Sequence, residues 1–463
     1  MKMANWQYSQ KYDVLILGAG AAGLAAARRL AAAGKSVAVV EARERIGGRI
    51  FTAPPAPGTA AATIPIELGA EFIHGLPRSS WDLIREAQLA TYELDGEPWC
   101  FDDGLLHACG EERRRAFEVV AQMPAWLAAQ PAGSDATFAE YLKRTAIDAS
   151  LAERASGYVE GFNAADRNII GVAALARQQR AANDIQADRI FRICRGYSAL
   201  PQFLADQFRQ SGGTIIFRRP VRAIRWSRGA VSFGGLDAEN RAFELHGEQA
   251  VITLPLGVLQ AEAVQFDPRP DDLMRQAARM AMGPVLRQTL LFDAPFWEGA
   301  QPSAAGARAT EGIADLGFLF AREETPATWW TVRPEAAPML TAWTAGPKAV
   351  ALAKKAALSG EPRTLLAEAL RVLSKIFGLE AATIEKMLVS WHTHDWQGDA
   401  YSRGAYSYAP AGALDASLRM TQPVAQTLYF AGEHTDTEGH WGTVHAALNS
   451  GLRAAEQLLE ARP

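Results

Sequence analysis

Three glycines near the start of the chain have the spacing that a phosphate-binding turn requires. Gly18, Gly20 and Gly23 form a Gly-x-Gly-x-x-Gly sequence directly after the apolar run Tyr12–Leu17. In such a turn the first glycine permits a sharp bend, the second lets a pyrophosphate approach the backbone, and the third lets the next helix pack closely on the strand. The N-terminus of that helix is then expected to bind phosphate through its N–H groups and its positive dipole.

An acidic residue stands where the ribose of a dinucleotide is expected. After the glycine turn, an Ala-, Leu- and Arg-rich helix ends near Gly34, a second strand covers 36–40, and Glu41 follows it. The Glu41 carboxylate is placed to accept hydrogen bonds from ribose hydroxyls, and it disfavours a 2′-phosphate. Strand, glycine turn, helix, strand and acid in this order predict a Rossmann-type domain that binds FAD or NAD.

A second glycine–arginine segment lies just beyond Glu41. Gly47 and Gly48 stand between Arg45 and Arg49. These residues can bring backbone and guanidinium groups close to another stretch of the same diphosphate, which favours FAD.

The C-terminal part of the chain is the next candidate for cofactor binding. A short strand is expected over 428–431, Gly432 and Glu433 follow it, and a helix is expected from Thr443 to about Leu459. Small residues on one side of this helix allow close packing. Its positive N-terminal end can stabilise negative charge on a ring system.

Composition limits the class of protein. At 463 residues the chain is expected to form two or three domains, and its net charge of -4 with 49% apolar residues gives no basic stripe for nucleic acid. No stretch reaches the ~20 apolar residues of a membrane span, and Met1–Tyr12 has no apolar signal core, so we expect no membrane partner and a cytoplasmic location. The three cysteines, Cys100, Cys109 and Cys194, have no CxxC or metal-ligand spacing. They argue against a disulfide framework and against a metal site.

Together these segments resemble the flavin amine oxidase superfamily, which includes monoamine, polyamine, spermine and L-amino-acid oxidases and the lysine-specific histone demethylases. The resemblance lies in VLILGAGAAGL (14–24), EARERIGGR (41–49), ELGAEFIHG (67–75), VITLPLGVL (251–259), the segment 391–408 and LYFAGEHTDTEGHWGTVHAALNSGLRAA (428–455). The segment 67–75 is especially similar to the ELGA-x-x-x-HG sequence of polyamine and spermine oxidases. The motifs extend over nearly the whole chain.

The resemblance implies an α/β fold in which a Rossmann-like (GR2-type) FAD-binding domain is interleaved with an α+β substrate-binding domain. We expect residues 1–75, 191–265 and 393–463 in the former and residues 76–190 and 266–392 in the latter. It implies FAD contacts from Gly18, Gly20, Ala21, Ala22, Gly23, Glu41, Ala42, Arg43, Gly47, Gly48, Arg49, Gly69, Ala70, Glu71, Val221, Trp391, Gly432, Glu433, Thr443 and Val444. Ala405 stands where monoamine oxidases carry the cysteine that bonds the flavin, so FAD is expected to be non-covalent.

The resemblance also implies the residues at the reacting end. Tyr406 resembles the tyrosine that stands over the flavin, and its ring face can attract a cationic amine. The second aromatic of the monoamine-oxidase pair is replaced by Thr443, and Trp441 or His440 is expected to substitute in part. His74 resembles the active-site histidine of animal polyamine oxidases, where a neutral imidazole can tune amine protonation.

Arg287 marks a departure from the family, which usually carries a lysine there, linked by water to flavin N5. Arginine keeps the positive charge but cannot act as a base, which puts fast reaction with oxygen in doubt. The Glu71 carboxylate is expected to anchor a remote ammonium group. Three tryptophans are candidates for the cavity wall: Trp329, Trp330 and Trp343.

The implied reaction is oxidation of a primary amine or polyamine by hydride transfer to FAD, with oxygen reoxidising the flavin to give hydrogen peroxide. The partners are a small-molecule amine and oxygen, and a monomer or homodimer is expected. The alternatives are an amine dehydrogenase slow with oxygen, a desaturase or protoporphyrinogen-type oxidase, a non-catalytic FAD-binding protein, and an L-amino-acid oxidase. The last would bind a carboxylate through an arginine such as Arg78, Arg177, Arg180 or Arg322. A histone-demethylase role is not expected, because the chain leaves no room for a histone-tail or partner-binding module.

Overall fold

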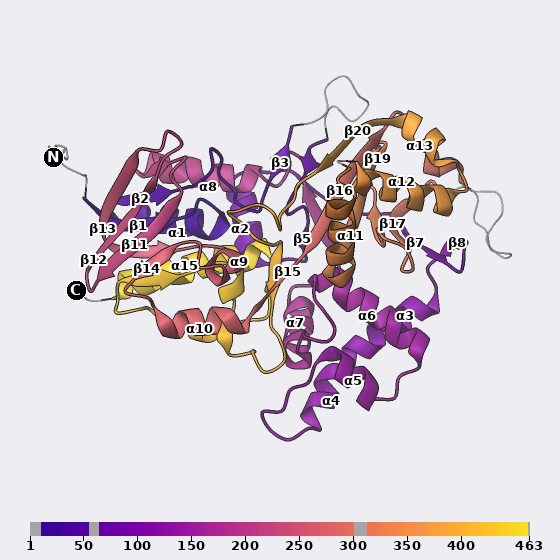
Figure 1. Ribbon diagram of the computed structural model, residues 1–463, viewed down its shortest axis with the longest axis horizontal. Coiled ribbons are helices and arrows are strands. Elements are labelled where there is room, and N and C mark those ends of the chain that lie inside the picture. The colour runs from indigo at the N-terminus through magenta and orange to yellow at the C-terminus, as the bar shows by residue number, and fades with distance from the viewer. Residues whose placement is uncertain (1–10, 55–63, 301–312, 362, 462–463) are drawn as a thin grey trace.

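The N-terminal glycine turn follows a strand of an eight-stranded mixed sheet, in the lobe at the left of Figure 1. The computed structural model describes residues 11–54, 64–300, 313–361 and 363–461, so all but the last two residues of the polar segment Met1–Tyr12 lie outside the described residues. The strand order is β10-β2-β1-β13-β12-β11-β14, and β22 also pairs with β13. The strands are β1 (Lys11–Leu17), β2 (Val37–Val40), β10 (Thr214–Ile216), β11 (Val221–Ser227), β12 (Ala230–Leu236), β13 (Ala242–Ile252), β14 (Gln265–Asp267) and β22 (Leu428–Phe430).

The parallel part of this sheet brings distant segments of the chain to one edge. Leu17 of β1 pairs with Val40 of β2 and with Ile252 of β13, and Ile252 pairs with Phe430 of β22. These are the last or nearly last residues of their strands, and ligands bind outside the carboxyl ends of such strands. The glycine turn, the acid after β2 and the C-terminal motif therefore meet at the same edge.

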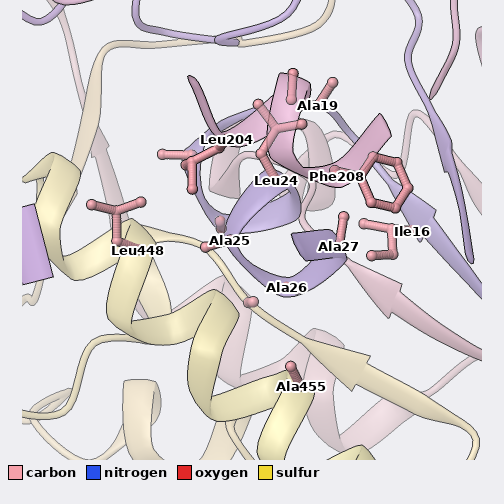
Figure 2. Packing of buried hydrophobic residues seen from close by; sticks show 14 of the residues in the cluster. Ile16, Ala19, Leu24, Ala25, Ala26, Ala27, Leu204, Phe208, Leu448 and Ala455 are labelled. Carbon is pink, nitrogen blue, oxygen red and sulfur yellow. The ribbon is translucent and has the colours of Figure 1, made fainter. Parts of the chain in front are cut away.

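Side chains of β1 alternate between two cores, as expected for a buried strand. Val14 and Ile16 share a core with the helices α1 (Ala21–Ala32), α8 (Ala199–Gln210) and α15 (Val444–Glu460). Figure 2 shows Ile16 beside Ala27 of α1 and Phe208 of α8. A Cβ at Gly451 of α15 would lie 2.1 Å from the Ala22 carbonyl oxygen, so the small residues of this helix let it cross α1 backbone to backbone. The other face of the sheet carries α9 (Leu256–Gln260), α10 (Asp271–Arg279) and α14 (Ala416–Met420).

A second sheet, of seven strands, lies in the other lobe (Figure 1) in the order β20-β16-β19-β18-β17-β7-β8. Every residue of its strand β16 is buried, with α11 and α12 among the helices that cover it. The elements of this lobe are β7 (Glu97–Asp102), β8 (Leu105–Ala108), β16 (Val285–Phe292), η1 (Phe296–Gly299), β17 (Leu316–Phe320), β18 (Thr328–Trp330), β19 (Met339–Ala345), α11 (Gly346–Ser359), α12 (Thr364–Phe377), α13 (Ala381–Met387) and β20 (Leu388–Thr393).

Short sheets and a group of helices complete the fold. The helices at the lower right of Figure 1 are α3 (Glu111–Ala121), α4 (Met123–Ala128), α5 (Phe138–Arg144), α6 (Ala149–Asn163) and α7 (Val172–Asp184). The remaining elements are α2 (Arg78–Glu86), η2 (Glu433–Thr435) and the strands β3 (Thr52–Ala53), β4 (Ile66–Glu67), β5 (Ile73–His74), β6 (Thr91–Glu93), β9 (Ile190–Ile193), β15 (Ala281–Gly283) and β21 (Tyr406–Tyr408). Each lobe draws on separated stretches of chain, and we propose the interleaved division given above, with the boundary after residue 265 moved beyond α10, because β14 and α10 belong to the first sheet and its core.

The cysteines correct one expectation. Cys100 and Cys109 form a disulfide across the β7–β8 hairpin, where their Cα atoms lie 5.1 Å apart, while Cys194 is free. The spacing of the cysteines in the sequence did not indicate this disulfide, because Cys100 and Cys109 come together only through the pairing of β7 with β8. Among the described residues, no helix has the length and the apolar character needed to cross a membrane.

Candidate functional site

A cavity of about 1490 Å³ lies at the edge where the motifs meet. The predicted cofactor-binding residues that line it are Gly18, Gly20, Ala21, Ala22, Glu41, Ala42, Arg43, Gly47, Gly48, Arg49, Gly69, Ala70, Glu71, Val221, Gly432, Glu433, Thr443 and Val444. The four predicted catalytic residues, His74, Arg287, Tyr406 and Trp441, line the same cavity. Gly23 and Trp391 lie elsewhere.

The glycine turn has the shape that a pyrophosphate needs. Gly18 has φ +103°, and a Cβ at Gly23 would lie 2.0 Å from the Gly18 carbonyl oxygen, so this glycine serves the packing of the turn. A Cβ at Gly20, in contrast, would meet no protein atom within 4 Å. Gly20 begins helix α1 without a side-chain cap, so the N–H groups of the first turn are left for a ligand.

The Glu41 carboxylate is fixed at the cavity wall by the backbone. Oε2 accepts a hydrogen bond from the Ala19 N–H at 2.8 Å, and Oε1 accepts one from the Arg43 N–H at 2.8 Å. Each oxygen retains a lone pair that can accept from a hydroxyl group. The carboxylate is therefore oriented toward the position that the sequence predicts for the ribose.

Arg49 and the buried Glu433 form an ion pair in the next part of the wall. Arg49 Nη1 lies 2.8 Å from Glu433 Oε1 and donates to the Ala405 carbonyl at 2.8 Å, and Glu433 Oε2 accepts from Ser407 Oγ at 2.6 Å and from the Gly442 N–H at 2.9 Å. Burial disfavours the charged carboxylate, but the Arg49 guanidinium and the Ser407 hydroxyl outweigh it and hold the Glu433 pKa below its usual value. This pair ties the two ends of the chain together.

Arg45 does not contribute to the diphosphate region, which corrects the expectation for the glycine–arginine segment. Its guanidinium lies over the Phe51 ring at 4.1 Å and donates to the Ile46 carbonyl. Burial lowers its pKa to about 10. Of the two arginines in that segment, Arg49 is the one that lines the cavity.

Helix α15 points its N-terminus at the cavity, as predicted. Thr443 is the N-cap; its side chain accepts from the Ala446 N–H at 3.2 Å and donates to the His440 carbonyl at 2.7 Å. Thr443 and Val444 both line the cavity. The positive end of a 17-residue helix therefore lies beside the cavity.

An aromatic wall lies at the C-terminal end of helix α6. Tyr406 donates from its hydroxyl to the Phe162 carbonyl at 2.7 Å, and Trp343 Nε1 donates to the Gly161 carbonyl at 2.9 Å. These bonds satisfy carbonyls that a helix end leaves unpaired. A Cβ at Gly442 would lie 2.8 Å from Tyr406 Cδ2, so the Tyr406 ring rests directly on backbone.

His74 faces this aromatic wall. Its ring makes edge contacts with Phe162 at 5.7 Å and with Phe72 at 6.0 Å, measured between ring centroids. Burial lowers its pKa to about 4. His74 is therefore a neutral imidazole at physiological pH, in line with the role predicted for it.

The tryptophans divide between cavity and core. Trp330 and Trp343 line the cavity, but Trp329 points to the opposite face of β18 and is completely buried in the core. Trp441 lines the cavity with its indole N–H bonded to Ser417 Oγ at 2.8 Å. It can offer its ring to a substrate but not a free N–H.

Trp391 was predicted to contact the cofactor, and the structure corrects this. It lies on β20 opposite Leu290, packs against the core of the second sheet and donates from Nε1 to Gln288 Oε1 at 3.0 Å. Trp396 lines the cavity instead and donates from Nε1 to the Leu68 carbonyl at 2.8 Å. Both residues fall in the segment 391–408, and only the end of β20 separates their environments.

Glu71 is not free to bind an ammonium group, which corrects a further expectation. Its oxygens lie 2.7 Å from Arg192 Nη2 and 2.5 Å from Arg287 Nη2. All three side chains are buried. Glu71 is therefore part of a buried ionic cluster beside the cavity.

Other cavity residues were not singled out from the sequence. Tyr158 and Phe162 lie four residues apart on α6, a spacing typical of one helix face, and their rings stack at 5.7 Å. His445 lines the cavity near the start of α15, and burial lowers its pKa to about 3. Of the four arginines considered for carboxylate binding, Arg322 lines the cavity, where Asp102 pairs with it at 2.8 Å.

Comparison with known proteins gives a consistent family assignment. The family described as flavin containing amine oxidoreductase matches residues 21–459. Lysine-specific histone demethylase 1 homolog 1 of Oryza sativa subsp. japonica is 29% identical over 97% of this chain and 52% of its own length. Probable polyamine oxidase 4 of Arabidopsis thaliana is 24% identical over 96% of this chain and 86% of its own length.

Solved structures share the fold. Wild-type putrescine oxidase bound to putrescine is 20% identical with a TM-score of 0.78, and the match covers 98% of this chain and 100% of that one. The chain spans about half the length of the first curated relative it matches, the demethylase homologue, of which 52% is covered.

Proposed function

Because the chain belongs to the flavin-containing amine oxidoreductase family, we propose that it oxidises an amine to an imine and passes the electrons to oxygen, giving hydrogen peroxide. One observation carries the proposal: the residues of the dinucleotide-binding turn and the aromatic wall around Tyr406 and His74 line the same cavity. When bound, FAD supplies the acceptor for the hydride that leaves the carbon next to the amine nitrogen.

FAD is the cofactor, and the cavity wall fits it. The uncapped start of α1 and the open surface at Gly20 suit a pyrophosphate, and the fixed Glu41 carboxylate suits a ribose. The N-terminus of α15 suits a ring system that gains negative charge. Ala405 offers no nucleophile, so we propose non-covalent binding, and acid precipitation of the protein should leave the flavin in the supernatant.

The aromatic wall prepares the amine. The Tyr406 ring can attract an ammonium group through its face. Removing that ammonium from water disfavours its charged form, so the amine releases its proton to the solvent as it enters the cavity. The neutral His74 can then hold the nitrogen by one hydrogen bond without competing for a positive charge. The neutral amine has the lone pair that hydride departure requires.

We propose a primary amine or polyamine as substrate. A polyamine oxidase homologue among the relatives supports this class, and the demethylase homologue adds methylated lysine as an amine to test. An amino acid substrate has less support, because the arginine that lines the cavity among those considered, Arg322, already pairs with Asp102.

The proposal is tested by incubating the purified protein in air with diamines, polyamines, aryl-alkyl amines, methyl-lysine peptides and L-amino acids. We expect peroxide and aldehyde in equal amounts from one class of amine. Peroxide from amino acids alone would move the assignment to an amino-acid oxidase. Peroxide from none of them, in a protein that retains FAD, would contradict the proposed oxidase.

A further inference from the structure

Two arginines share one carboxylate at the cavity wall. Arg192 Nη2 lies 2.7 Å from Glu71 Oε1, and Arg287 Nη2 lies 2.5 Å from Glu71 Oε2. The three side chains are between 2% and 5% exposed, so the pairs are shielded from water and salt.

The cluster is held between the short sheet β5-β9-β6 and the seven-stranded sheet. Arg192 lies on β9, Arg287 on β16, and Trp330 of β18 donates from Nε1 to Glu71 at 3.2 and 3.3 Å from its two oxygens. Arg287 Nη1 also donates to the Gly69 carbonyl at 3.3 Å. Glu71 has its oxygens fully engaged and cannot turn to another partner.

The cluster of Glu71, Arg192 and Arg287 carries one net positive charge. Two guanidinium groups face a single carboxylate, and arginine stays protonated in proteins. Two other titratable groups lie near. Burial raises the pKa of Tyr92 to about 12 and that of Glu67 to about 7, so neither adds charge at pH 6.

The surplus charge lies next to the cavity. Arg287 lines the cavity, and its Nε has no hydrogen-bond partner among the described residues, nor has Nη1 of Arg192. A buried unpaired charge is costly unless an opposite charge is supplied. Among the groups that this cavity accommodates, the flavin gains negative charge when it is reduced.

We propose that Arg192 is a positioning residue that keeps the charge of Arg287 available to the flavin. By binding one oxygen of Glu71, Arg192 neutralises the carboxylate that would otherwise cancel Arg287. Without Arg192 the remaining Glu71–Arg287 pair is neutral. The cluster thereby favours any state in which the flavin ring is negative, whichever amine is oxidised.

Sulfite tests this charge without any amine, because it adds to oxidised flavins and leaves the ring negative. We would titrate the FAD-loaded protein with sulfite at pH 6, follow the loss of flavin absorbance, and measure the midpoint potential in parallel. Arg192→Met should weaken sulfite binding about tenfold, which corresponds to the loss of ~1.4 kcal/mol of attraction between the cluster and the negative ring. For a two-electron couple the same factor lowers the potential by about 30 mV.

The matched control is Arg189→Met. Arg189 precedes β9 by one residue and pairs with Glu93 at 2.6 Å on the surface. The same substitution there should leave sulfite affinity and potential unchanged. An equal loss in both variants would show a general effect of the substitution and overturn the proposal.

Restoring the charge separates electrostatics from packing. Glu71→Gln combined with Arg192→Met leaves Arg287 as the only charge, so sulfite affinity should return close to that of the unaltered protein. Glu71→Gln alone leaves two positive charges and should bind sulfite more tightly. If every variant binds sulfite more weakly, in proportion to its loss of thermal stability, the role of Arg192 is structural and the proposal is wrong. If Arg192→Met loses FAD, the sulfite affinity of the Glu71→Gln variant still decides between an electrostatic and a purely structural role.

Discussion

The substitution Gly20→Ala should leave the stability of the FAD-free protein unchanged and weaken the binding of FAD. Gly20 has φ −80° and ψ −178°, which any residue adopts, and an added Cβ meets no protein atom within 4 Å. The fold without FAD should therefore change in stability by less than about 1 kcal/mol. The methyl group, however, projects from the cavity wall where the pyrophosphate is expected to approach.

The expected cost falls on the cofactor. Overpacking by one methyl group typically costs ~1–3 kcal/mol, which at ~1.4 kcal/mol per tenfold change weakens FAD binding roughly 5- to 150-fold. The assay is titration of flavin-free protein with FAD, followed by the quenching of flavin fluorescence, with thermal unfolding of the same samples.

Two other glycines serve as references. Gly299 of η1 also has no atom within 4 Å of an added Cβ, and it lies away from the cavity, so Gly299→Ala should alter neither measurement. Gly23→Ala would place its Cβ 2.0 Å from a backbone oxygen, so it should destabilise the protein even without FAD. If Gly20→Ala bound FAD as tightly as the unaltered protein, the pyrophosphate would not lie at this turn.

Three further predictions follow from the site. Glu433→Gln leaves the partly exposed Arg49 without its charged partner and should lower the free energy of unfolding by ~1–3 kcal/mol at pH 7, measured by urea denaturation. Because folding lowers the Glu433 pKa, the stability that Glu433 contributes is complete above its unfolded pKa near 4.5 and is lost as the pH falls through its folded pKa. The difference in free energy of unfolding between the two proteins should therefore shrink below about pH 4.5. A difference that stays constant with pH would contradict the ion pair. Thr443→Ala removes the N-cap of α15 and should cost ~1 kcal/mol with a lower melting temperature, whereas Thr443→Ser should retain most of the stability; equal losses would refute the cap. His74→Asn should lower kcat/KM about tenfold, which corresponds to the loss of one hydrogen bond of ~1.4 kcal/mol. The pH at which activity rises should not change, because His74 is already neutral above about pH 5. A displaced pH profile would show that His74 titrates in the reaction.

The fold could be predicted where local pattern and function coincide. The strand before Gly18, the strand before Glu41 and the helix after Thr443 are found within one residue of their predicted bounds. Each combines an apolar run with a glycine or an acid that marks its end, and the parallel pairing then brings the three motifs to one edge. The family match confirms the fold that these local patterns predict.

The parts that could not be predicted depend on contacts between distant segments. Glu71 pairs with Arg287 and with Arg192. Arg192 lies on β9, which pairs with β5 through only two residues, and no local pattern indicates that pairing. Trp329 and Trp330 are neighbours in sequence, and only the direction of β18 sends one to the core and the other to the cavity. Trp396 lines the cavity where Trp391 was predicted to do so, because the residue at which β20 ends decides which tryptophan reaches the cavity.

The measurement that tests the proposed function most directly is anaerobic mixing of the FAD-loaded protein with single amines. Putrescine, spermidine, spermine, phenylethylamine, tryptamine and several L-amino acids would each be added while the flavin absorbance is recorded, and air admitted afterwards. We predict that one class of amine bleaches the flavin, that amino acids do not, and that air restores the colour with release of peroxide. Bleaching that air reverses only slowly would make the protein an amine dehydrogenase. A flavin that no amine bleaches would contradict amine oxidation altogether.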